Sequence, residues 1–245
     1  MGIPVIGCHC PVCSSDSPHN KRSRPSAMLQ VNDKSILIDC GQEFRLQALK
    51  HHLDRLDGVI FTHAHHDHSA GIDDLRAYYL HHNDAIPCLL SQETLKDLEV
   101  RYHYIFDGKM YPDKLASKLD LRIMEGERGQ IDFIGVPIQY TSFKQTGMKV
   151  NGLRIGSFAY VSDIKEYDES IFEDLKGVET LVLSALRFTP SWMHLTVDEA
   201  VEFSKKVNAK MTYFTHIAHE LDHEKTNAYL PSNIRMAYDG LLINF

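Results

Sequence analysis

Short apolar runs recur along the chain, and most of them have the length of a buried strand. The run SILIDC covers Ser35–Cys40, and the run GVIFT covers Gly58–Thr62 and ends directly before a histidine. Such runs, bounded by turn-forming residues, predict strands. Asp239-Gly240 predicts a hairpin between a strand at Arg235–Tyr238 and one at Leu241–Asn244. The same pattern predicts strands at Leu121–Met124, Ile131–Tyr140, Leu153–Ile155, Phe158–Val161, Glu179–Leu183, Met211–Phe214, Arg235–Tyr238 and Leu241–Asn244.

Three segments carry helix signals. Asp73–His82 has aspartates in its first turn, and Ser91 is placed to cap a helix that extends to about Phe106. The sequence TVDE at Thr196–Glu199 is a capping box that opens a helix to about Val207. Strands cluster first and then alternate with helices, so the pattern predicts an α/β fold with two sheets face to face and helices outside.

Composition narrows the class of protein. The 245 residues contain no internal repeat or linker-like stretch, which favours a single domain over residues 1–245. No apolar run approaches the roughly 20 residues of a membrane span, so we expect no membrane-spanning segment. The net charge of −7, from 26 basic and 33 acidic residues, disfavours a nucleic-acid-binding surface but leaves room for a phosphate held by metal ions.

The cysteines form two groups. Cys8, Cys10 and Cys13 fall within six residues, whereas Cys40 and Cys88 stand alone. An odd total of five cysteines and an N-terminus without the basic flank of a signal peptide favour the reducing cytoplasm. Clustered thiols are there more often metal ligands than disulfides, and isolated ones are most simply small buried residues.

The chain holds 15 histidines, and four of them lie in the segment THAHHDH directly after a predicted strand. A loop leaving a strand can aim His63 and His65 at one point and then turn Asp67 and His68 toward a second. Neutral imidazole and carboxylate are the ligands that zinc prefers in proteins. The segment therefore predicts metal binding rather than a solvated polar loop, while His66 is expected to have a supporting or surface role.

The residues HAHHDH resemble the HxHxDH signature of the metallo-β-lactamase superfamily. Further strand-end residues match the order of that superfamily, namely Asp39, Asp163 and His216. Within it, the chain resembles the PhnP-like cyclic phosphodiesterases, because CHCPVC at Cys8–Cys13 is similar to their CxCxxC and THIAH at Thr215–His219 to their THIxH. The resemblance extends over nearly the whole chain.

This resemblance implies a four-layer αββα sandwich with a dinuclear metal site at the sheet edge. It also implies a separate structural zinc, and three thiolates with one imidazole would indeed close a tetrahedron with no open position. The alternative for these cysteines is oxidised or idle thiols. The implied ligands are His63, His65 and Asp163 for metal one; Asp67, His68, His216 and the bridging Asp163 for metal two; and Cys8, Cys10, Cys13 and His219 for the structural zinc.

The chain departs from the family pattern in two places. It has no histidine between His103 and His194, so the further ligand expected for metal one falls on Gln145, with Thr141 or Ser142 as alternatives. An amide oxygen is a weak zinc ligand but suits harder ions such as Mn²⁺. The chain also begins inside a glycine-containing turn. Either the true start lies upstream or an early strand is missing, and an unpaired sheet edge would favour association, such as a homodimer.

Three further residues are candidates for supporting roles at the metal site. His194, just before the capping box, resembles a histidine near the metals of PhnP-like enzymes, where it would protonate the leaving oxygen or hold a phosphate oxygen. The alternative is a histidine that meets solvent at the start of a helix. Asp39 is expected to orient a ligand histidine, or else to cap a turn. His223 is expected to be exposed, with a role at the site as the alternative.

Together these features predict a cytoplasmic, metal-dependent phosphodiesterase. By resemblance, its substrate is a small cyclic or nucleotide-like phosphodiester, its cofactors are two divalent ions, Zn²⁺ or Mn²⁺, plus one structural zinc, and its catalytic residues are Asp67 and His194. One alternative is a nuclease that processes RNA, which the acidic charge disfavours. Others are a thioester or lactam hydrolase, and a degenerate member with a structural or regulatory role, which the glutamine at position 145 motivates.

Overall fold

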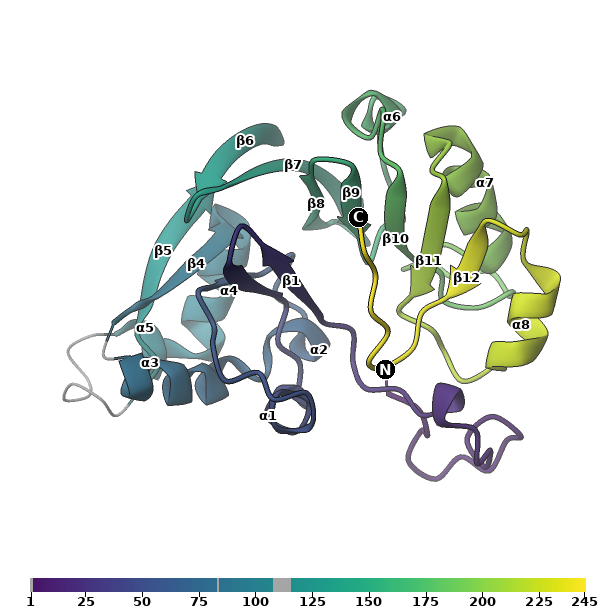
Figure 1. The fold of residues 1–245 in the computed structure, drawn as a ribbon, viewed down its shortest axis with the longest axis horizontal. Helices are drawn as coiled ribbons and strands as arrows, with labels where there is room; N and C mark the ends of the chain where they lie inside the picture. The colour runs from purple at the N-terminus through teal and green to yellow at the C-terminus, as the bar shows by residue number, and fades with distance from the viewer. Residues whose placement is uncertain (1, 83, 108–115) are drawn as a thin grey trace. The chain divides into compact units, whose positions relative to one another are not determined.

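The computed structural model describes residues 2–82, 84–107 and 116–245, and it divides into two compact units (Figure 1). The N-terminal unit is Arg24–Ile138. The C-terminal unit consists of the residues up to Ser23 together with Gln139–Phe245. Each unit has its own sheet strands and its own covering helices. Within the described residues, no helix combines the length and the apolar character that a membrane crossing requires.

The N-terminal unit is built on a five-stranded sheet with the order β1-β2-β3-β4-β5. Strands β1 and β2 are antiparallel, and the other neighbours are parallel. The strands are β1 (Ala27–Val31), β2 (Lys34–Ile38), β3 (Gly58–Ile60), β4 (Ile86–Ser91) and β5 (Leu119–Met124). The helices are α1 (Phe44–Lys50), α2 (His66–Ser69), the 3₁₀-helix η2 (Ile72–Leu75), α3 (Arg76–His82), α4 (Gln92–Arg101) and α5 (His103–Phe106).

The core of this unit explains why its strands are almost continuously apolar. Val59 and Leu90 from the central strands are fully buried and pack with Phe44 of α1 and Leu98 of α4. Strands of a parallel sheet are buried on both faces, which favours unbroken runs of branched apolar residues. Cys88 belongs to the same core, and its burial raises the pKa of its thiol. The expectation that the isolated cysteines are small buried residues is therefore confirmed, since Cys40 and Cys88 are both fully buried.

The strands of the C-terminal unit lie in a sheet with the order β12-β11-β10-β9-β8-β7-β6. Strands β9 to β12 are parallel neighbours, whereas β7, β8 and β9 pair antiparallel. The strands are β7 (Val136–Gln145), β8 (Met148–Ile155), β9 (Phe158–Val161), β10 (Thr180–Ser184), β11 (Met211–Thr215) and β12 (Ile234–Met236). The last strand of this order, β6 (Arg128–Phe133), and the first three residues of β7 fall within the residue range of the N-terminal unit. The helices are the 3₁₀-helix η1 (Pro18–Asn20), α6 (Ile171–Asp174), α7 (Val197–Val207) and α8 (His223–Tyr229).

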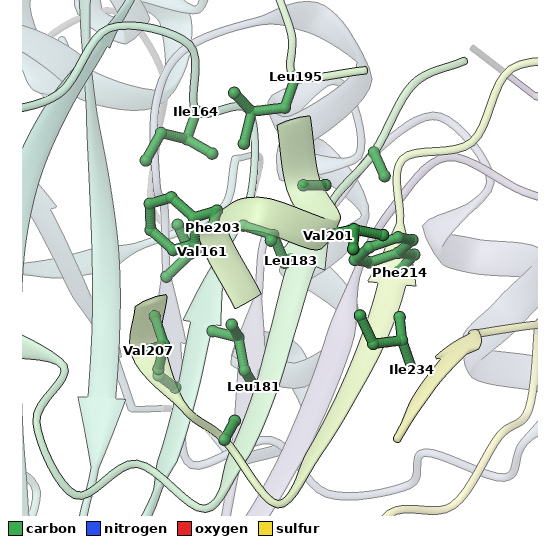
Figure 2. Close-up of a cluster of buried hydrophobic side chains, with 14 of the residues drawn as sticks. Val161, Ile164, Leu181, Leu183, Leu195, Val201, Phe203, Val207, Phe214 and Ile234 are labelled. Carbon is green, nitrogen blue, oxygen red and sulfur yellow. The ribbon is translucent and has the colours of Figure 1, made fainter. Parts of the chain in front are cut away.

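Helix α7 covers one face of this sheet (Figures 1 and 2). Phe203 is only 1% exposed and packs with Leu183 of β10 and Phe214 of β11 in one apolar cluster. The helix begins at the predicted capping box: the Thr196 hydroxyl accepts from the Glu199 amide at 3.1 Å, and the Glu199 carboxylate accepts from the Thr196 amide at 2.7 Å. The sequence therefore predicts both the start of α7 and its buried face correctly.

Two strand predictions are wrong. Ile131–Tyr140 is not one strand, because the chain reverses at Ile134 and Gly135, whose φ angles are 53° and 87°. The apolar pattern continues through this turn and hides it. The second error is the predicted C-terminal hairpin. Strand β12 instead pairs parallel with β11, and residues 241–245, all described, hold no strand.

Loss of the cap on α7 gives a direct test of its contribution. Thr196→Ala removes the acceptor for the Glu199 amide and should lower the free energy of unfolding by about 1 kcal/mol, the usual value of such a cap. Thr189→Ala removes an exposed threonine hydroxyl from the preceding loop and should have almost no effect. Urea denaturation of both variants measures the difference. Equal midpoints would contradict a stabilising capping box.

Candidate metal centres

Three residues singled out in the sequence share an uncommon backbone conformation. Asp39, Asp163 and His216 have φ angles of 57°, 60° and 55°, and each follows the end of a strand of its own unit. Residues other than glycine rarely adopt this left-handed conformation, since it costs free energy that the surroundings must offset. Such residues gather at functional sites. Nothing in the sequence pattern indicates this conformation.

In the N-terminal unit, the histidine segment follows β3 and continues into α2. His63 and His68 are completely buried, His65 is half-buried, and His66 is exposed, as expected for the variable position of the signature. His63 Nε2 lies 3.0 Å from His65 Nδ1, and the rings of His63 and His68 have centroids 4.3 Å apart. Three imidazoles therefore converge within this unit.

The carboxylate of Asp39 fixes this segment. Its two oxygens accept from the Thr62 amide at 2.8 Å and the Thr62 hydroxyl at 2.7 Å, and Oδ2 lies 2.7 Å from His68 Nδ1. All three residues are fully buried. A hydrogen bond from Nδ1–H to the carboxylate leaves the lone pair of His68 on Nε2, which is the nitrogen a metal would take. Asp39 therefore orients His68, while the role of His68 as a metal ligand stays a prediction.

A glycine beside Asp67 has a role that sequence reasoning missed. A Cβ atom on Gly41 would lie 2.3 Å from the carbonyl oxygen of Asp67, a distance that no packed structure tolerates. A Cβ atom on Gly71 would in turn lie 2.5 Å from the carbonyl oxygen of Gly41. Both glycines therefore allow close approach of the backbone around the signature. Gly71 lies three residues after His68, but Gly41 lies 22 residues before His63, so the sequence alone does not connect the two glycines.

In the C-terminal unit, Asp163 gathers the other predicted residues. His216 Nε2 lies 3.2 Å from Asp163 Oδ1, and His194 Nδ1 lies 3.5 Å from the same oxygen. The rings of His194 and His216 stack with centroids 4.6 Å apart. Ser162 donates to the other oxygen, Asp163 Oδ2, at 2.6 Å. His194 is only 6% exposed, so the alternative of a histidine that merely meets solvent does not hold.

Gln145 ends β7 directly against this group. Its Nε2 donates to Asp163 Oδ1 at 3.0 Å and lies 3.1 Å from His194 Nε2. The side chain is 1% exposed, and Oε1 is buried with no hydrogen-bond partner among the described residues. Of the three candidates for this position, Thr141 instead bonds Asp174 and Ser142 bonds Asn151. A buried acceptor without a donor is costly, and a nearby cation would satisfy it.

The predicted zinc ligands lie together in the C-terminal unit. The Sγ atoms of Cys8, Cys10 and Cys13 lie 3.3, 3.5 and 3.5 Å from Nδ1 of His219. All four donor atoms fall within 4.8 Å of one another. Sulfur and imidazole ligands of one zinc ion must have about this spacing, and the cysteines form no disulfide. The donor set therefore fits a closed tetrahedral zinc site.

The thiols of Cys10 and Cys13 have pKa values that are shifted in opposite directions. The amide of Cys13 donates to Cys10 Sγ, and this bond, with those to His219 and Cys8, lowers the pKa of Cys10 to about 6 despite partial desolvation. At Cys13, the amide of Val5 lowers the pKa, but burial and the neighbouring Cys10 and Cys8 outweigh it and raise the pKa. Three acidic groups crowded together resist ionising at once. A divalent cation is the natural counter-charge for three thiolates.

His223 is not exposed, contrary to the expectation from its helical spacing. It is 5% exposed, its amide donates to Asn20, and its ring nitrogens contact Arg22 NH2 and Asn227 Nδ2 at 3.0 Å each. Burial, and next the Arg22 charge, lower the pKa of its imidazole. The residues before β1 pack over the start of α8, which local spacing cannot reveal. His223 therefore anchors that segment.

The remaining predicted metal ligands come from both units. Imidazole and carboxylate groups suit a divalent ion such as zinc, so both sets fit the metal that the motifs imply. In the N-terminal unit they are His63, His65, Asp67 and His68; in the C-terminal unit they are Asp163 and His216.

Comparison with known proteins identifies the family. A family model described as the beta-lactamase superfamily domain matches residues 34–217. The chain belongs to the metallo-β-lactamase superfamily. A crystal structure of a diphosphatase from the PhnP family is 36% identical, with a TM-score of 0.91, covering 100% of this chain and 93% of that one. The PhnP-like resemblance and the αββα fold class are thus confirmed, and the superfamily fold implies divalent metal ions, typically zinc.

Two curated relatives extend this picture. An octanoyltransferase of Porphyromonas gingivalis is 33% identical over 98% of this chain, but the chain spans only 48% of that protein's length. A ribonuclease Z of Methanopyrus kandleri is 24% identical over 92% of this chain and 93% of its own length. The predicted membership in a superfamily of metal-dependent hydrolases is confirmed by the family match.

The zinc cluster makes a prediction about stability. Cys10→Ser replaces a thiol of lowered pKa by a hydroxyl, so the variant should lose zinc and unfold at a lower temperature, because metal binding is coupled to folding. Cys88→Ser, a buried thiol far from the cluster in sequence, is the control, and it should keep its zinc content. Elemental analysis and thermal denaturation measure both effects. Unchanged zinc and melting temperature in Cys10→Ser would refute the site.

Proposed function

We propose that this chain is a metal-dependent phosphodiesterase that hydrolyses a small cyclic or nucleotide-like phosphodiester. The observation that carries the proposal is the buried group around Asp163, in which a carboxylate, two histidines and an amide meet at the end of parallel strands. Open α/β sheets bind their ligands at the carboxyl ends of the strands. Family membership adds the class of chemistry, which is metal-dependent hydrolysis.

Two sets of residues would hold the catalytic ions. When bound, two divalent ions would act as Lewis acids on the phosphate and lower the pKa of an attacking water. Asp39 and Ser162 support the set by fixing one histidine and one carboxylate through buried hydrogen bonds. The proposed ligands are His63, His65 and Asp163 for one ion; Asp67, His68, His216 and the shared Asp163 for the other; and Cys8, Cys10, Cys13 and His219 for a structural zinc.

Two side chains would handle protons in the reaction. Asp67 takes the proton of the attacking water, since a carboxylate is an effective general base when it is held in place. His194 gives a proton to the leaving oxygen. Its ring is buried against Gln145 and stacked on His216, so its position is set before substrate arrives. A group that is held in place in this way lowers the barrier by orientation as well as by proton transfer.

Phosphate chemistry is favoured over other hydrolyses by the relatives. One is a diphosphatase and another is a ribonuclease Z, and both names refer to substrates that contain phosphate. A nuclease role remains the second candidate, because the ribonuclease Z relative matches 92% of this chain. The net charge of −7 favours a small substrate over RNA. A degenerate, purely structural role is disfavoured because the donor residues of both units are present.

Replacement of Asp163 tests the shared ligand and the reaction together. Asp163→Ala should lose the catalytic ions while the Cys8–His219 zinc remains, and hydrolysis of cyclic nucleotides or model diesters with added Zn²⁺ or Mn²⁺ should fall by at least about a hundredfold. Asp174→Ala, which removes a half-buried carboxylate of the same unit, is the control. Undiminished catalytic-site metal in Asp163→Ala would show that the assignment is wrong. A wild type inactive on every diester but active on RNA would favour the nuclease.

The position of Gln145 beside Asp163 leads to a separate prediction about metal affinity. Gln145→His supplies an imidazole beside Asp163. The ion proposed to be held by His63, His65 and Asp163 should then bind about tenfold more tightly, which is a usual effect of changing a residue near a metal ion. Gln145→Leu, which removes the amide without adding a ligand, should bind it no better than the wild type. Titration with Zn²⁺ and with Mn²⁺ gives the affinities. Equal affinities for wild type and Gln145→His would mean that position 145 does not contribute to the metal shell.

A further inference from the structure

One loop of the C-terminal unit connects the site around Asp163 to a separate cavity. It joins β10 to α7, and His194 lies near its end while Phe188 lies near its start. The loop is tied together at its base, because the Leu186 amide donates to the Leu195 carbonyl at 3.0 Å and the Ala218 amide donates to the Leu186 carbonyl at 2.9 Å. The cavity and His194 are therefore held in a defined relation within this unit.

The cavity has a volume of about 500 Å³, and Cys10 and His219 of the proposed zinc site form part of its lining. Pro11 and Val12 contribute to one part of its lining, and Phe188 and Tyr229 contribute to another. The two rings meet edge to face, with centroids 5.1 Å apart and planes at 88°. The Tyr229 hydroxyl donates to Asp198 at 2.7 Å, so its ring is anchored to α7. This volume lies in the range of small-molecule sites.

The charges around the cavity are largely compensated. Glu220 accepts from Arg187 NH1 at 3.2 Å. Asp222 accepts from the Lys225 amide at 3.1 Å, and its pKa is lowered by this bond, by the Asn20 amide and by the Lys225 charge. A balanced rim provides little attraction for an anion such as phosphate. What remains available is the aromatic surface, which favours a planar, uncharged group.

The same loop exposes more apolar surface than a solvent-facing loop needs. Phe188 is 42% exposed, Trp192 is 91% exposed and Met193 is 43% exposed. Clustered large apolar side chains at the surface mark binding sites. The same loop positions His194, the proposed proton donor. The simplest ligand for the cavity is therefore a part of the substrate itself.

We infer that this cavity binds the nucleobase of a nucleotide-type substrate, with Phe188 as the stacking surface. The inference rests on the proposed function, because it assigns the organic group of that phosphodiester to a subsite of its own. A base stacked on Phe188 would extend from a phosphate held near His194. The loop between them would then determine which phosphodiesters are accepted, by requiring an aromatic group attached to the phosphate.

Binding of adenosine tests the subsite without any hydrolysis. Calorimetry with the zinc-loaded protein should show that adenosine and AMP bind and that ribose 5-phosphate, which lacks the base, binds more weakly than AMP. Phe188→Ala should weaken adenosine binding by about five- to a hundredfold, the usual effect of losing a stacking aromatic. Tyr229→Phe, which keeps the ring but removes the bond to Asp198, should weaken it less.

Phe245→Ala is the matched control, because Phe245 is 47% exposed but does not line the cavity, and it should bind adenosine like the wild type. Zinc content and melting temperature establish that each variant is folded. Absence of adenosine binding, or equal binding by Phe188→Ala, overturns the subsite even if model diesters are hydrolysed. Failure of diester hydrolysis with adenosine binding intact would overturn the proposed function and leave the subsite standing.

Discussion

The carboxylate of Asp39 is completely buried, and the signature segment depends on how that buried charge is satisfied. It accepts two hydrogen bonds from Thr62 and one from His68, so the residues on both sides of His63 are held by a single group. An unpaired carboxylate in this position would cost several kcal/mol. The orientation of the histidines is therefore a consequence of folding in the N-terminal unit.

The C-terminal unit applies the same principle to a different set of groups. Ser162 and Gln145 each donate to Asp163, one to each oxygen, while His194 and His216 stack beside it. His216 is followed after three residues by His219, whose ring lies among the three cysteines. A zinc ion at that cluster would hold the turn after β11 and with it the left-handed backbone of His216. Stability and function are linked through this short stretch of chain.

Gln145 stands where the resemblance implies a further histidine ligand. The amide replaces an expected imidazole, yet it is buried, bonded to Asp163 and close to His194. It thus serves both the proposed metal site and the proposed proton donor. Specificity is assigned to Phe188, near the start of the loop between β10 and α7, and the proposed proton donor His194 lies near the end of the same loop. Substrate choice and proton transfer are therefore assigned to one loop of this unit.

The sequence by itself determined the candidate metal ligands and their order along the chain, the cap of α7 and the family, because these depend on residue type and short spacing. Only the tertiary structure selected Gln145 over Thr141 and Ser142, since side chains of one strand differ in the partners that the fold brings to them. The hydrophobic pattern of the sequence likewise did not predict the burial of His223 under the segment before β1 or the turn within Ile131–Tyr140. Periodicity reports which residues avoid water, but the partner that a buried polar group finds is decided by contacts between residues far apart in the chain.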